Sequence, residues 1–453
     1  MTYFRNHDEL LSHGNATLRA DALDILDAGL AAADPGRKTR ELVSLEGDVL
    51  RIAGREFDLR KAGGIYVLGA GKATFPIADA LDGILGDRIT DGLVICKEGQ
   101  EGELKHCRMF LASHPIPGEA GLAAARRVLD LARGTAPGDI VLACITGGSS
   151  ALMPLPVPEI SLEDKKIASE LLLTCGANIV EINAVRKHLS RIKGGLLALA
   201  LHPGTVLVNL TVSDVIGDPY DYITDPTVPD TSSFADARRT LDKYSLWDKM
   251  PPPVAAYLKT APAGRETPKA LSGRTVINHM LVKGDDACGG AAAKARELGY
   301  APMILSSMLE GESRETGRTF VCIGAEIVRS SRPLARPCAV IGGGETTVRL
   351  PDGKAGRGGP NQEFVLGAAL AMDAMTGMVV AGLDTDGTDG PTHYAGGIAD
   401  ESTLRRANAL GINIFSSLES HDASPVLVAL GDALNTGNTG TNVNDLKLML
   451  VGG

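Results

Sequence analysis

Residues 65–80 read Ile65-Tyr66-Val67-Leu68-Gly69-Ala70-Gly71-Lys72-Ala73-Thr74-Phe75-Pro76-Ile77-Ala78-Asp79-Ala80, and this stretch decides the fold. An apolar run stops at a Gly-Ala-Gly turn and a helical pattern follows, which predicts a strand, a tight turn and a helix. The start of a helix presents unpaired backbone N–H groups and the positive end of the helix dipole, so it attracts an anion. We therefore expect Gly69, Gly71 and Lys72 to bind an anion. A plain turn with a solvated lysine is the alternative.

Two familiar nucleotide-binding fingerprints are incomplete in this turn. A Walker A loop requires glycine at position 66 and serine or threonine at position 73, whereas the chain has Tyr66 and Ala73. A dinucleotide fingerprint requires a third glycine at position 74, where Thr74 stands. The turn therefore belongs to neither standard class.

The rest of the chain repeats the alternation of strand and helix. Strand-like runs at 65–69, 92–96, 108–112, 139–145 and 205–212 are mostly separated by helical segments, which predicts βαβ units and a parallel sheet. A second series follows at 274–278, 302–306, 337–341 and 377–382. The predicted fold class is α/β, with two domains that each carry a largely parallel sheet flanked by helices.

Length and composition agree with two domains of this class. A chain of 453 residues exceeds one ordinary core, and a content of 44% hydrophobic but only 4% aromatic residues is typical of helices packed closely on parallel sheets. Residues 226–270 are rich in proline, aspartate and threonine, and we expect them to connect the domains. We place a Rossmann-like domain at residues 1–250 and a second α/β domain at residues 251–453.

The charge and the cysteines limit the partners and the compartment. A formal net charge of −10 argues against nucleic acid or an anionic membrane as the main partner, so an anionic substrate needs a local basic cluster. The seven cysteines are scattered without a C-x-x-C spacing, no apolar run approaches a membrane span, and the N-terminus has no signal pattern. We expect a cytoplasmic protein that acts on small molecules. A homodimer stays open.

Polar loops follow several of the predicted strands. Ser149 and Ser150 stand in a Gly-Gly-Ser-Ser turn, where glycines admit a close approach and hydroxyls contact oxyanions. Glu345 follows three glycines, and Asn361 opens a helix after a loop that contains Arg357. Because ligands of open α/β sheets bind beyond the carboxyl ends of strands, we expect the loops at 69–72, 146–151, 213–218, 342–347 and 384–389 to line one cleft. Plain turns are the alternative.

Aspartates concentrate in two of these loops. Asp214 and Asp218 follow the strand at 205–212, and Asp384, Asp386 and Asp389 follow the strand at 377–382. Carboxylates at strand ends hold magnesium beside phosphates, and Asp214 can also accept a proton. Helix caps and solvated turns are the alternatives.

A basic helix is predicted at residues 179–201. Arg186 and Lys193 are seven residues apart, so on a continuous helix they project within ~20° of each other. With Asn183 on the same segment, they form a candidate site for carboxylate or phosphate. A solvated charged face is the alternative.

Five motifs together resemble the glycerate 2-kinase family, and residues 336–450 resemble its C-terminal MOFRL domain. The motifs are Gly69-Ala70-Gly71-Lys72-Ala73, Thr146-Gly147-Gly148-Ser149-Ser150-Ala151, Asn183-Ala184-Val185-Arg186-Lys187-His188-Leu189-Ser190, Ser213-Asp214-Val215-Ile216-Gly217-Asp218-Pro219 and Gly342-Gly343-Gly344-Glu345-Thr346-Thr347. The resemblance implies phosphorylation of D-glycerate to 2-phosphoglycerate with ATP and Mg²⁺, in a cleft between two domains. It also implies that Lys72 and an arginine of the C-terminal domain are catalytic.

Two departures from the family pattern affect the site. The family reads Gly-Gly-Arg-Asn-Gln-Glu where this chain has Pro360 before Asn361, which leaves Arg357 as the candidate arginine. His393-Tyr394 stand where smaller or acidic residues are expected.

Three alternatives stay open. The first is a hydroxypyruvate reductase that uses NAD(P)H. Two features argue against it: the third glycine is missing, and no acidic residue stands at the end of the second predicted strand. The others are a kinase for a related sugar acid and a sensor without catalysis.

Overall fold

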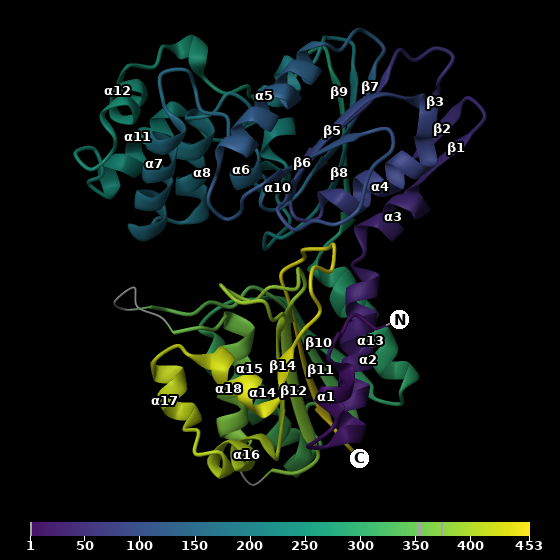
Figure 1. Cartoon of the computed structure of the whole chain (residues 1–453), viewed down its shortest axis with the longest axis vertical. Helices are drawn as coiled ribbons and strands as arrows, with labels where there is room; N and C mark the ends of the chain where they lie inside the picture. Colours follow the sequence, from purple (N-terminus) through teal and green to yellow (C-terminus); the bar gives the residue numbers. More distant parts are fainter. Residues whose placement is uncertain (1, 351–355, 373–374) are drawn as a thin grey trace. The chain divides into compact units, whose positions relative to one another are not determined.

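The computed structural model describes residues 2–350, 356–372 and 375–453 of the chain (Figure 1). The chain forms two compact units. The Rossmann unit spans Pro35–Leu281, and the mixed-sheet unit comprises the N-terminal segment up to Asp34 together with Val282–Gly453. This division differs from the predicted one at residue 250, because the N-terminal helices pack in the same unit as the C-terminal half. The inter-domain cleft stays a prediction.

The Rossmann unit is built on a six-stranded sheet in the order β6-β5-β4-β7-β8-β9. The pairs β4–β5, β4–β7, β5–β6 and β7–β8 are all parallel, which confirms the predicted parallel sheet. Counted from β4, the order is 3-2-1-4-5-6, and sheets of this order bind ligands where it reverses, between β4 and β7. The strands are β4 (Ile65–Ala70), β5 (Ile89–Lys97), β6 (Arg108–Ala112), β7 (Ile140–Ile145), β8 (Val206–Val212) and β9 (Thr275–Val282).

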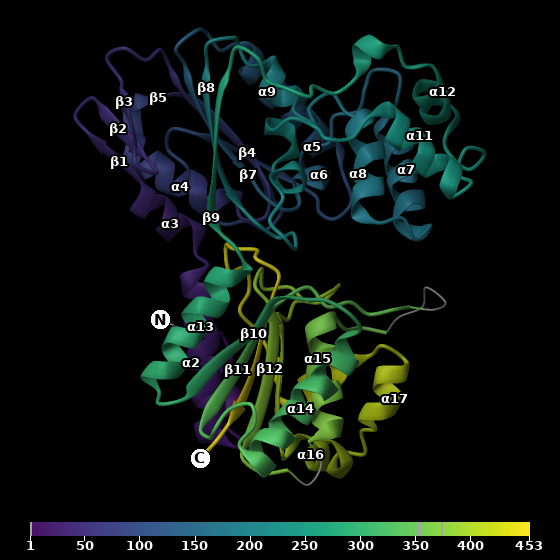
Figure 2. The same cartoon turned by 180° about the vertical axis from the view of Figure 1, so that it is seen from behind.

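Helices cover this sheet on both faces (Figures 1 and 2). Leu68, Ile95 and Val141 share one apolar cluster with α5 and α9, whereas α4 contacts β4, β5 and β7 outside this cluster. A small antiparallel sheet, β1-β2-β3, precedes β4 and had no counterpart among the predicted strands. The elements are α3 (Pro35–Leu42), β1 (Val43–Glu46), β2 (Val49–Ile52), β3 (Arg55–Asp58), α4 (Thr74–Leu85), η1 (Gly86–Arg88), α5 (Glu119–Arg133) and α9 (Leu196–Ala200).

Helices that come before and after β8 in the chain form a layer of their own at one side of the Rossmann unit (Figure 2). It has its own buried core, to which Phe234, Leu241 and Val254 contribute. These three residues belong to the segment 226–270, so that segment is part of the Rossmann unit and the prediction that it connects two domains is wrong. Between β7 and β9 the chain forms, besides β8, the elements α6 (Ser149–Leu152), α7 (Leu162–Thr174), α8 (Ile179–His188), α10 (Tyr220–Ile223), η2 (Asp225–Thr227), α11 (Phe234–Lys243), α12 (Pro252–Thr260) and η3 (Ala263–Arg265), of which α7, α8, α11 and α12 share this core.

The second unit contains a mixed sheet in the order β10-β11-β15-β12-β13-β14. Only β10 and β11 pair in parallel; the other pairings are antiparallel, so the expectation of a largely parallel second sheet is wrong. Two strands cause this: β15, the last strand of the chain, lies between β11 and β12 and runs opposite to both, and β13 runs opposite to β12 and β14. The strands are β10 (Ala301–Leu309), β11 (Cys338–Gly344), β12 (Met378–Asp384), β13 (Gly396–Asp400), β14 (Ala433–Leu434) and β15 (Asp445–Val451).

The side chains of these strands alternate between two apolar cores. Ile341 and Leu448 pack with α2 and α13, whereas Val340 and Met449 pack with α14 and α15. Strands buried on both faces need apolar residues at successive positions, which is what their sequences have. The helices are α1 (His7–Leu11), α2 (Ala16–Ala32), α13 (Gly284–Glu297), α14 (Ser313–Ser330), α15 (Pro360–Ala371), α16 (Thr403–Ala409), α17 (Ile414–Glu419) and α18 (Ala423–Leu430).

A buried ion pair attaches α2 to this unit. The guanidinium of Arg19 donates to Asp400 at 2.5 Å and to Asp432 at 2.8 Å, and all three side chains are fully buried. Burial alone would raise the pKa of Asp400, but Arg19 and the hydrogen bonds to this carboxylate hold it below its usual range. The N-terminal helix is therefore anchored by charge as well as by apolar contacts.

Two features of the chain concern its cysteines and its longest helices. All seven cysteines are free thiols and five of them are buried, as is typical of small apolar groups. In the described part of the chain, no helix has the length and apolar character needed to cross a membrane.

Candidate active site

The Gly69–Lys72 turn follows β4 and lies beside the loop after β7. The N–H groups of Lys72 and Ala73 donate to Gly147 O at 2.8 Å and Thr146 Oγ1 at 3.2 Å, and the N–H of Gly71 donates to Ile95 O at 3.2 Å. These three N–H groups are thus engaged within the protein, and the predicted anion-binding role of Gly69 and Gly71 stays a prediction. The turn can also offer an anion the side chain of Lys72.

Close packing explains why this turn needs Gly71. A Cβ at Gly71 would lie 2.0 Å from Thr146 Oγ1, and its φ of +149° lies in the region that favours glycine. The turn and the β7 loop therefore hold each other in place. This contact fixes the backbone from which Lys72 projects.

The segment that follows β7 lines part of a cavity of about 750 Å³. Gly148 has a φ of +85°, and a Cβ there would lie 3.2 Å from both Lys72 Cγ and His114 Nε2. Gly148 and Ser150 line the cavity, whereas Ser149 is buried at the start of α6. The cavity therefore lies at the carboxyl end of β7, next to Lys72. The remaining lining residues are His114, Pro115, Ile116, Pro117, Ala151, Glu163, Lys165, Lys166, Ile167, Ser169, Glu170, Leu173, Arg186 and Lys193.

Arg186 and Lys193 both line this cavity, although the helix predicted to carry them is interrupted. Helix α8 ends at His188, and Gly194 and Gly195 adopt φ values of +60° and +81° before α9 begins. The continuous helix 179–201 is therefore wrong, because glycines in this conformation end a helix. Asn183 is half-buried on α8 and is not among the lining residues.

Lys193 is neutralised within the protein, whereas a neighbouring lysine is not. Lys193 Nζ lies 3.1 Å and 3.0 Å from the two carboxylate oxygens of Asp225. Lys165 on α7 is only 4% exposed, and its ammonium has no hydrogen-bond partner. Burial lowers the pKa of Lys165 to about 7, assisted by Lys193 and Arg186 and opposed by Asp225. Sequence reasoning missed Lys165, which stands in an ordinary amphipathic helix without a motif.

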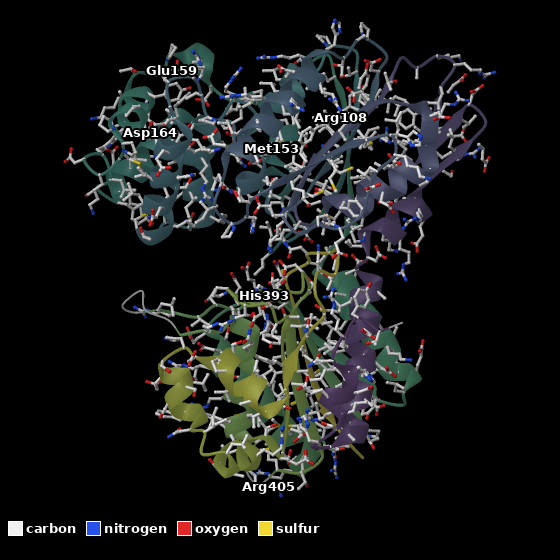
Figure 3. All side chains as sticks on the ribbon, in the orientation of Figure 1. Arg108, Met153, Glu159, Asp164, His393 and Arg405 are labelled. Carbon is white, nitrogen blue, oxygen red and sulfur yellow. The ribbon has the colours of Figure 1, made fainter. Side chains whose placement is uncertain are left out.

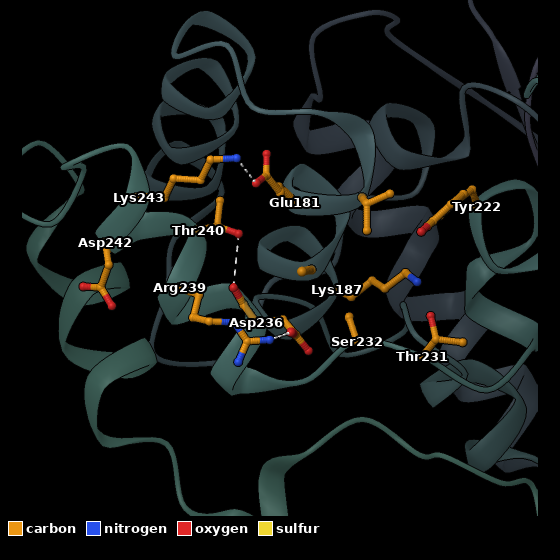
Figure 4. Close-up of a pocket in the computed structure, with 12 residues that line it drawn as sticks. Glu181, Lys187, Tyr222, Thr231, Ser232, Asp236, Arg239, Thr240, Asp242 and Lys243 are labelled. Carbon is orange, nitrogen blue, oxygen red and sulfur yellow. Dashed lines mark hydrogen bonds and ion pairs between the residues drawn. The ribbon is translucent and has the colours of Figure 1, made fainter.

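A second cavity of the Rossmann unit, of about 510 Å³, has a different character (Figure 4). Its charged side chains pair with carboxylates: Lys243 lies 2.6 Å from Glu181, Arg239 contacts Asp236, and Lys187 lies 3.0 Å from Asp230. The charges of this cavity are therefore neutralised within the protein. The cavity of Gly148 and Lys165 is the better candidate for an anionic ligand.

Asp214 and Asp218 lie in the loop that follows β8. Because β8 runs parallel to β7 as its neighbour, this loop leaves the same edge of the sheet as the Gly148 loop. Both side chains are half-buried, and Asp218 has a φ of +56°. Their predicted roles toward metal and proton stay predictions.

In the mixed-sheet unit, the predicted residues gather around Asp445, which sequence reasoning missed. The register aligns both Gly344 of β11 and Asp384 of β12 with Asp445 at the start of β15. Gly344 and the two glycines before it lie inside β11, so the loop begins only at Glu345, which is exposed. Lys447 Nζ lies 2.5 Å from Asp445, and both side chains are buried.

Asn361 and Asp389 belong to the same buried network. Asn361 Nδ2 donates to Asp445 at 2.6 Å and to Asp389 at 3.1 Å. The carboxylate of Asp389 also accepts the backbone N–H groups of Asn361 and Gln362, so it caps the start of α15. Burial raises the pKa of Asp389 to about 7. The capping alternative therefore describes Asp389.

Arg357 and the two departures from the family pattern lie near this network. Pro360 occupies the first turn of α15, where its missing N–H is tolerated. Arg357 is exposed, and its backbone N–H donates to Asp422 at 2.7 Å. His393, labelled in Figure 3, is exposed on the loop after β12. The catalytic role of Arg357 stays a prediction.

The other two aspartates of the loop after β12 bind backbone groups. The Asp384 carboxylate accepts the N–H of Asp386 at 3.1 Å, and the Asp386 carboxylate accepts the N–H of Thr388 at 2.8 Å. Among the described residues, no group of three or more histidine, cysteine, aspartate or glutamate side chains is placed to hold a metal ion. A metal held only by protein side chains therefore has no support here, whereas one held by one or two carboxylates and substrate phosphates stays a prediction.

One observation against a dinucleotide site needs correction. The second strand, β5, ends at Lys97 and is followed at once by the exposed Glu98. An acidic residue therefore does stand where a dinucleotide fold holds the ribose. The missing third glycine remains, since Thr74 is buried there and donates to Cys144 O at 2.8 Å.

Comparisons with known proteins cover both units. One family model, described as a domain of unknown function (DUF4147), matches residues 21–259, and the MOFRL family matches residues 338–445. The chain is 39% identical to the glycerate 2-kinase of Pyrococcus horikoshii, over 96% of this chain and 97% of that protein. It is 38% identical to a protein of Agrobacterium vitis provisionally named a hydroxypyruvate reductase, over 94% of this chain and 93% of that one. The crystal structure of a glycerate kinase from Thermotoga maritima has a TM-score of 0.82 and 36% identity, over 96% of this chain and 99% of that one.

Proposed function

The chain belongs to the glycerate kinase family with a C-terminal MOFRL domain, and from this premise we propose that it transfers the terminal phosphoryl group of ATP to the 2-hydroxyl of D-glycerate. The observation that supports this most is the cavity of the Rossmann unit, where Lys165, Arg186 and Lys193 gather in a chain of net charge −10. Glycerate is an anion, and this cavity offers it more positive than negative charge.

Lys72 is proposed to act on the phosphoryl group. Phosphoryl transfer depends on aligning donor and acceptor and on neutralising charge on the moving oxygens, and an ammonium does the second directly. The backbone of Lys72 is held by the bond to Gly147 and by the packing of Gly71 on Thr146. The side chain of Lys72 therefore extends from a fixed turn beside the cavity.

The roles of the other predicted residues are proposed on the same basis. Asp214 accepts the proton of the 2-hydroxyl or holds magnesium, since its loop leaves the same sheet edge as Gly148. Arg357 neutralises phosphate charge. Ser150 contacts an oxyanion through its hydroxyl, and Glu345 and Asn361 position the nucleotide.

Magnesium is proposed to be held by carboxylates together with phosphate oxygens. The candidate ligands are Asp214, Asp218, Asp384 and Asp386, which offer only oxygen atoms, as this ion prefers. Asp389 is the poorest candidate, because three N–H donors already bind its carboxylate. When bound, magnesium neutralises charge on the transferring phosphoryl group.

A second candidate is the reduction of hydroxypyruvate with NAD(P)H. The Rossmann strand order and Glu98 at the end of β5 favour it. A kinase for a related sugar acid is a variant of the main proposal, since the cavity of about 750 Å³ exceeds what three carbons need.

One pair of assays separates these functions. The protein is incubated with ATP, MgCl₂ and D-glycerate, and the product is identified by ³¹P NMR as 2- or 3-phosphoglycerate. A parallel sample receives NADH or NADPH with hydroxypyruvate, and absorbance at the nicotinamide band is followed. Formation of 2-phosphoglycerate without nicotinamide oxidation is the expected result. Nicotinamide oxidation without phosphoryl transfer would overturn the kinase proposal, and four-carbon acids in the first assay test the substrate range.

A further inference from the structure

Lys165 differs from the other buried lysines of the described residues. Lys187 and Lys193 each pair with an aspartate, and Lys447 pairs with Asp445. Lys165 is equally buried, at 4% exposure, but its ammonium finds no acceptor in the protein. A buried ammonium without a partner is destabilising, so folds avoid it unless something outside the chain supplies the acceptor.

Among the charged residues of the cavity, the cations around Lys165 are more buried than the carboxylates. Arg186 and Lys193 face it, and the single carboxylate that acts on it, Asp225, is already bound by Lys193. Glu163 and Glu170 also line the cavity, but both are exposed. The two carboxylates of the cavity are therefore more exposed than Lys165, Arg186 and Lys193. The other titratable residues that line the cavity are His114 and Lys166.

We propose that Lys165 binds the carboxylate of the acid substrate, as the third cation of this cavity beside Arg186 and Lys193. This inference rests on the proposed function and adds a residue to its substrate site. A carboxylate supplies the acceptor that the buried ammonium lacks, and it leaves the protein without an unpaired charge there. In a 2-hydroxy acid the hydroxyl is on the carbon next to the carboxylate. Fixing the carboxylate at Lys165 therefore also places the hydroxyl that reacts.

Two other roles for Lys165 are distinguishable by chemistry. As a general base, Lys165 would have to be neutral, and arginine, which is always charged, would not replace it. As a ligand of nucleotide phosphates, it would affect ADP binding rather than glycerate binding. The carboxylate role predicts that arginine retains part of the affinity and that ADP binding is unaffected.

The test measures binding and turnover in the full-length protein. Isothermal titration calorimetry at pH 7 follows D-glycerate alone and Mg-ADP alone, for the wild type, Lys165→Met, Lys165→Arg and the control Lys166→Met. Lys166 lines the same cavity from the next position of α7, but it lies 3.4 Å from Glu163 and is paired. If Lys165→Met does not fold, Lys165→Gln replaces it, and thermal denaturation checks both.

We expect Lys165→Met to raise the Kd of D-glycerate at least about tenfold, the effect of losing a charged hydrogen bond. Lys165→Arg should lose less, and Lys166→Met should stay within about twofold of the wild type. Unchanged glycerate affinity in a folded Lys165 variant, or a loss confined to ADP, overturns the inference while the kinase proposal stands. A wild type that forms no phosphoglycerate overturns the proposed function itself, and with it the identity of the acid.

Discussion

Replacing Lys165 with methionine should stabilise the Rossmann unit at neutral pH. The ammonium is buried without a partner, and methionine fills similar space without a charge. A pKa of about 7 in place of 10.5 means that folding disfavours the charged form by about 3.5 pH units, or about 5 kcal/mol at roughly 1.4 kcal/mol each. The expected gain is smaller, about 2–4 kcal/mol, because the wild-type protein relaxes around the charge.

The effect should depend on pH in a defined direction. Between pH 7 and 10.5 the unfolded state holds a proton on this lysine that the folded state has released, so the wild type gains stability as pH rises. The methionine variant has no such group. Its advantage should therefore be largest at pH 7 or below and should shrink steadily toward pH 10.

A urea titration followed by tryptophan fluorescence measures this effect. Trp247 is the single tryptophan of the chain, and it packs against the core of the helical layer that contains α7. The buffer must lack phosphate and carboxylates, since a bound anion would stabilise the wild type. Lys166→Met is the control, with an expected change within about 0.5 kcal/mol. A Lys165→Met variant that is less stable than the wild type at pH 7, or a difference that does not shrink at higher pH, would refute the reasoning.

Three further predictions concern other parts of the chain. Lys72→Ala should lower kcat by roughly two to four orders of magnitude with an unchanged Tm, and Lys72→Arg should recover little; near-normal turnover in a steady-state assay would leave Lys72 a residue of a structural turn. Arg19→Leu should destabilise the mixed-sheet unit by about 3–5 kcal/mol, because it removes the cation that pairs with the buried carboxylate of Asp400 and leaves Asp432 with Arg406 alone as an arginine partner; circular dichroism during denaturation measures this, and a loss below 1 kcal/mol contradicts it. Excess EDTA should abolish phosphoryl transfer and excess MgCl₂ restore it, whereas full activity in EDTA would remove magnesium from the proposal.

The local pattern of the sequence predicted the strands and most of the helices. Each predicted strand of the Rossmann unit overlaps an observed one, and helices lie between most of them as expected. This agreement is expected, because a short apolar run followed by a glycine turn depends on neighbouring residues alone. The parallel sheet followed from the alternation of these elements.

The errors came from contacts between distant parts of the chain. The insertion of β15 between β11 and β12 made the second sheet mixed, and no local pattern encodes that neighbour relation. The pairing of Arg19 with Asp400 and Asp432 likewise joins residues 381 and 413 positions apart, so the N-terminal helix appeared to belong to the first domain. Local rules set element types, but long-range packing decides which elements share a core.

Part of the lining of the Rossmann-unit cavity was predicted from local patterns. Gly148, Arg186 and Lys193 drew notice through glycine and charge patterns, and they do line one cavity. Lys165 carries no pattern of its own, because the signal is its burial without a partner, and burial is a tertiary property. The N–H groups of Gly71, Lys72 and Ala73, expected to be unpaired, are engaged because acceptors in β5 and in the loop after β7 reach them, which is also a tertiary property.

These hydrogen bonds change how this protein can attract an anion. In dinucleotide folds the glycine turn binds phosphate through backbone N–H groups, which carry no net charge and remain hydrogen-bonded to water when the ligand leaves. Here the N–H groups of Gly71, Lys72 and Ala73 donate hydrogen bonds to acceptors within the protein. At these positions an anion would therefore be attracted mainly by side chains. A side-chain cation is stronger, but when it is buried it destabilises the empty site. The buried, unpaired ammonium of Lys165 thus lowers the stability of the empty protein, and the same ammonium is proposed to raise its affinity for the acid substrate. The unfolding experiment measures the first effect and the binding experiment measures the second.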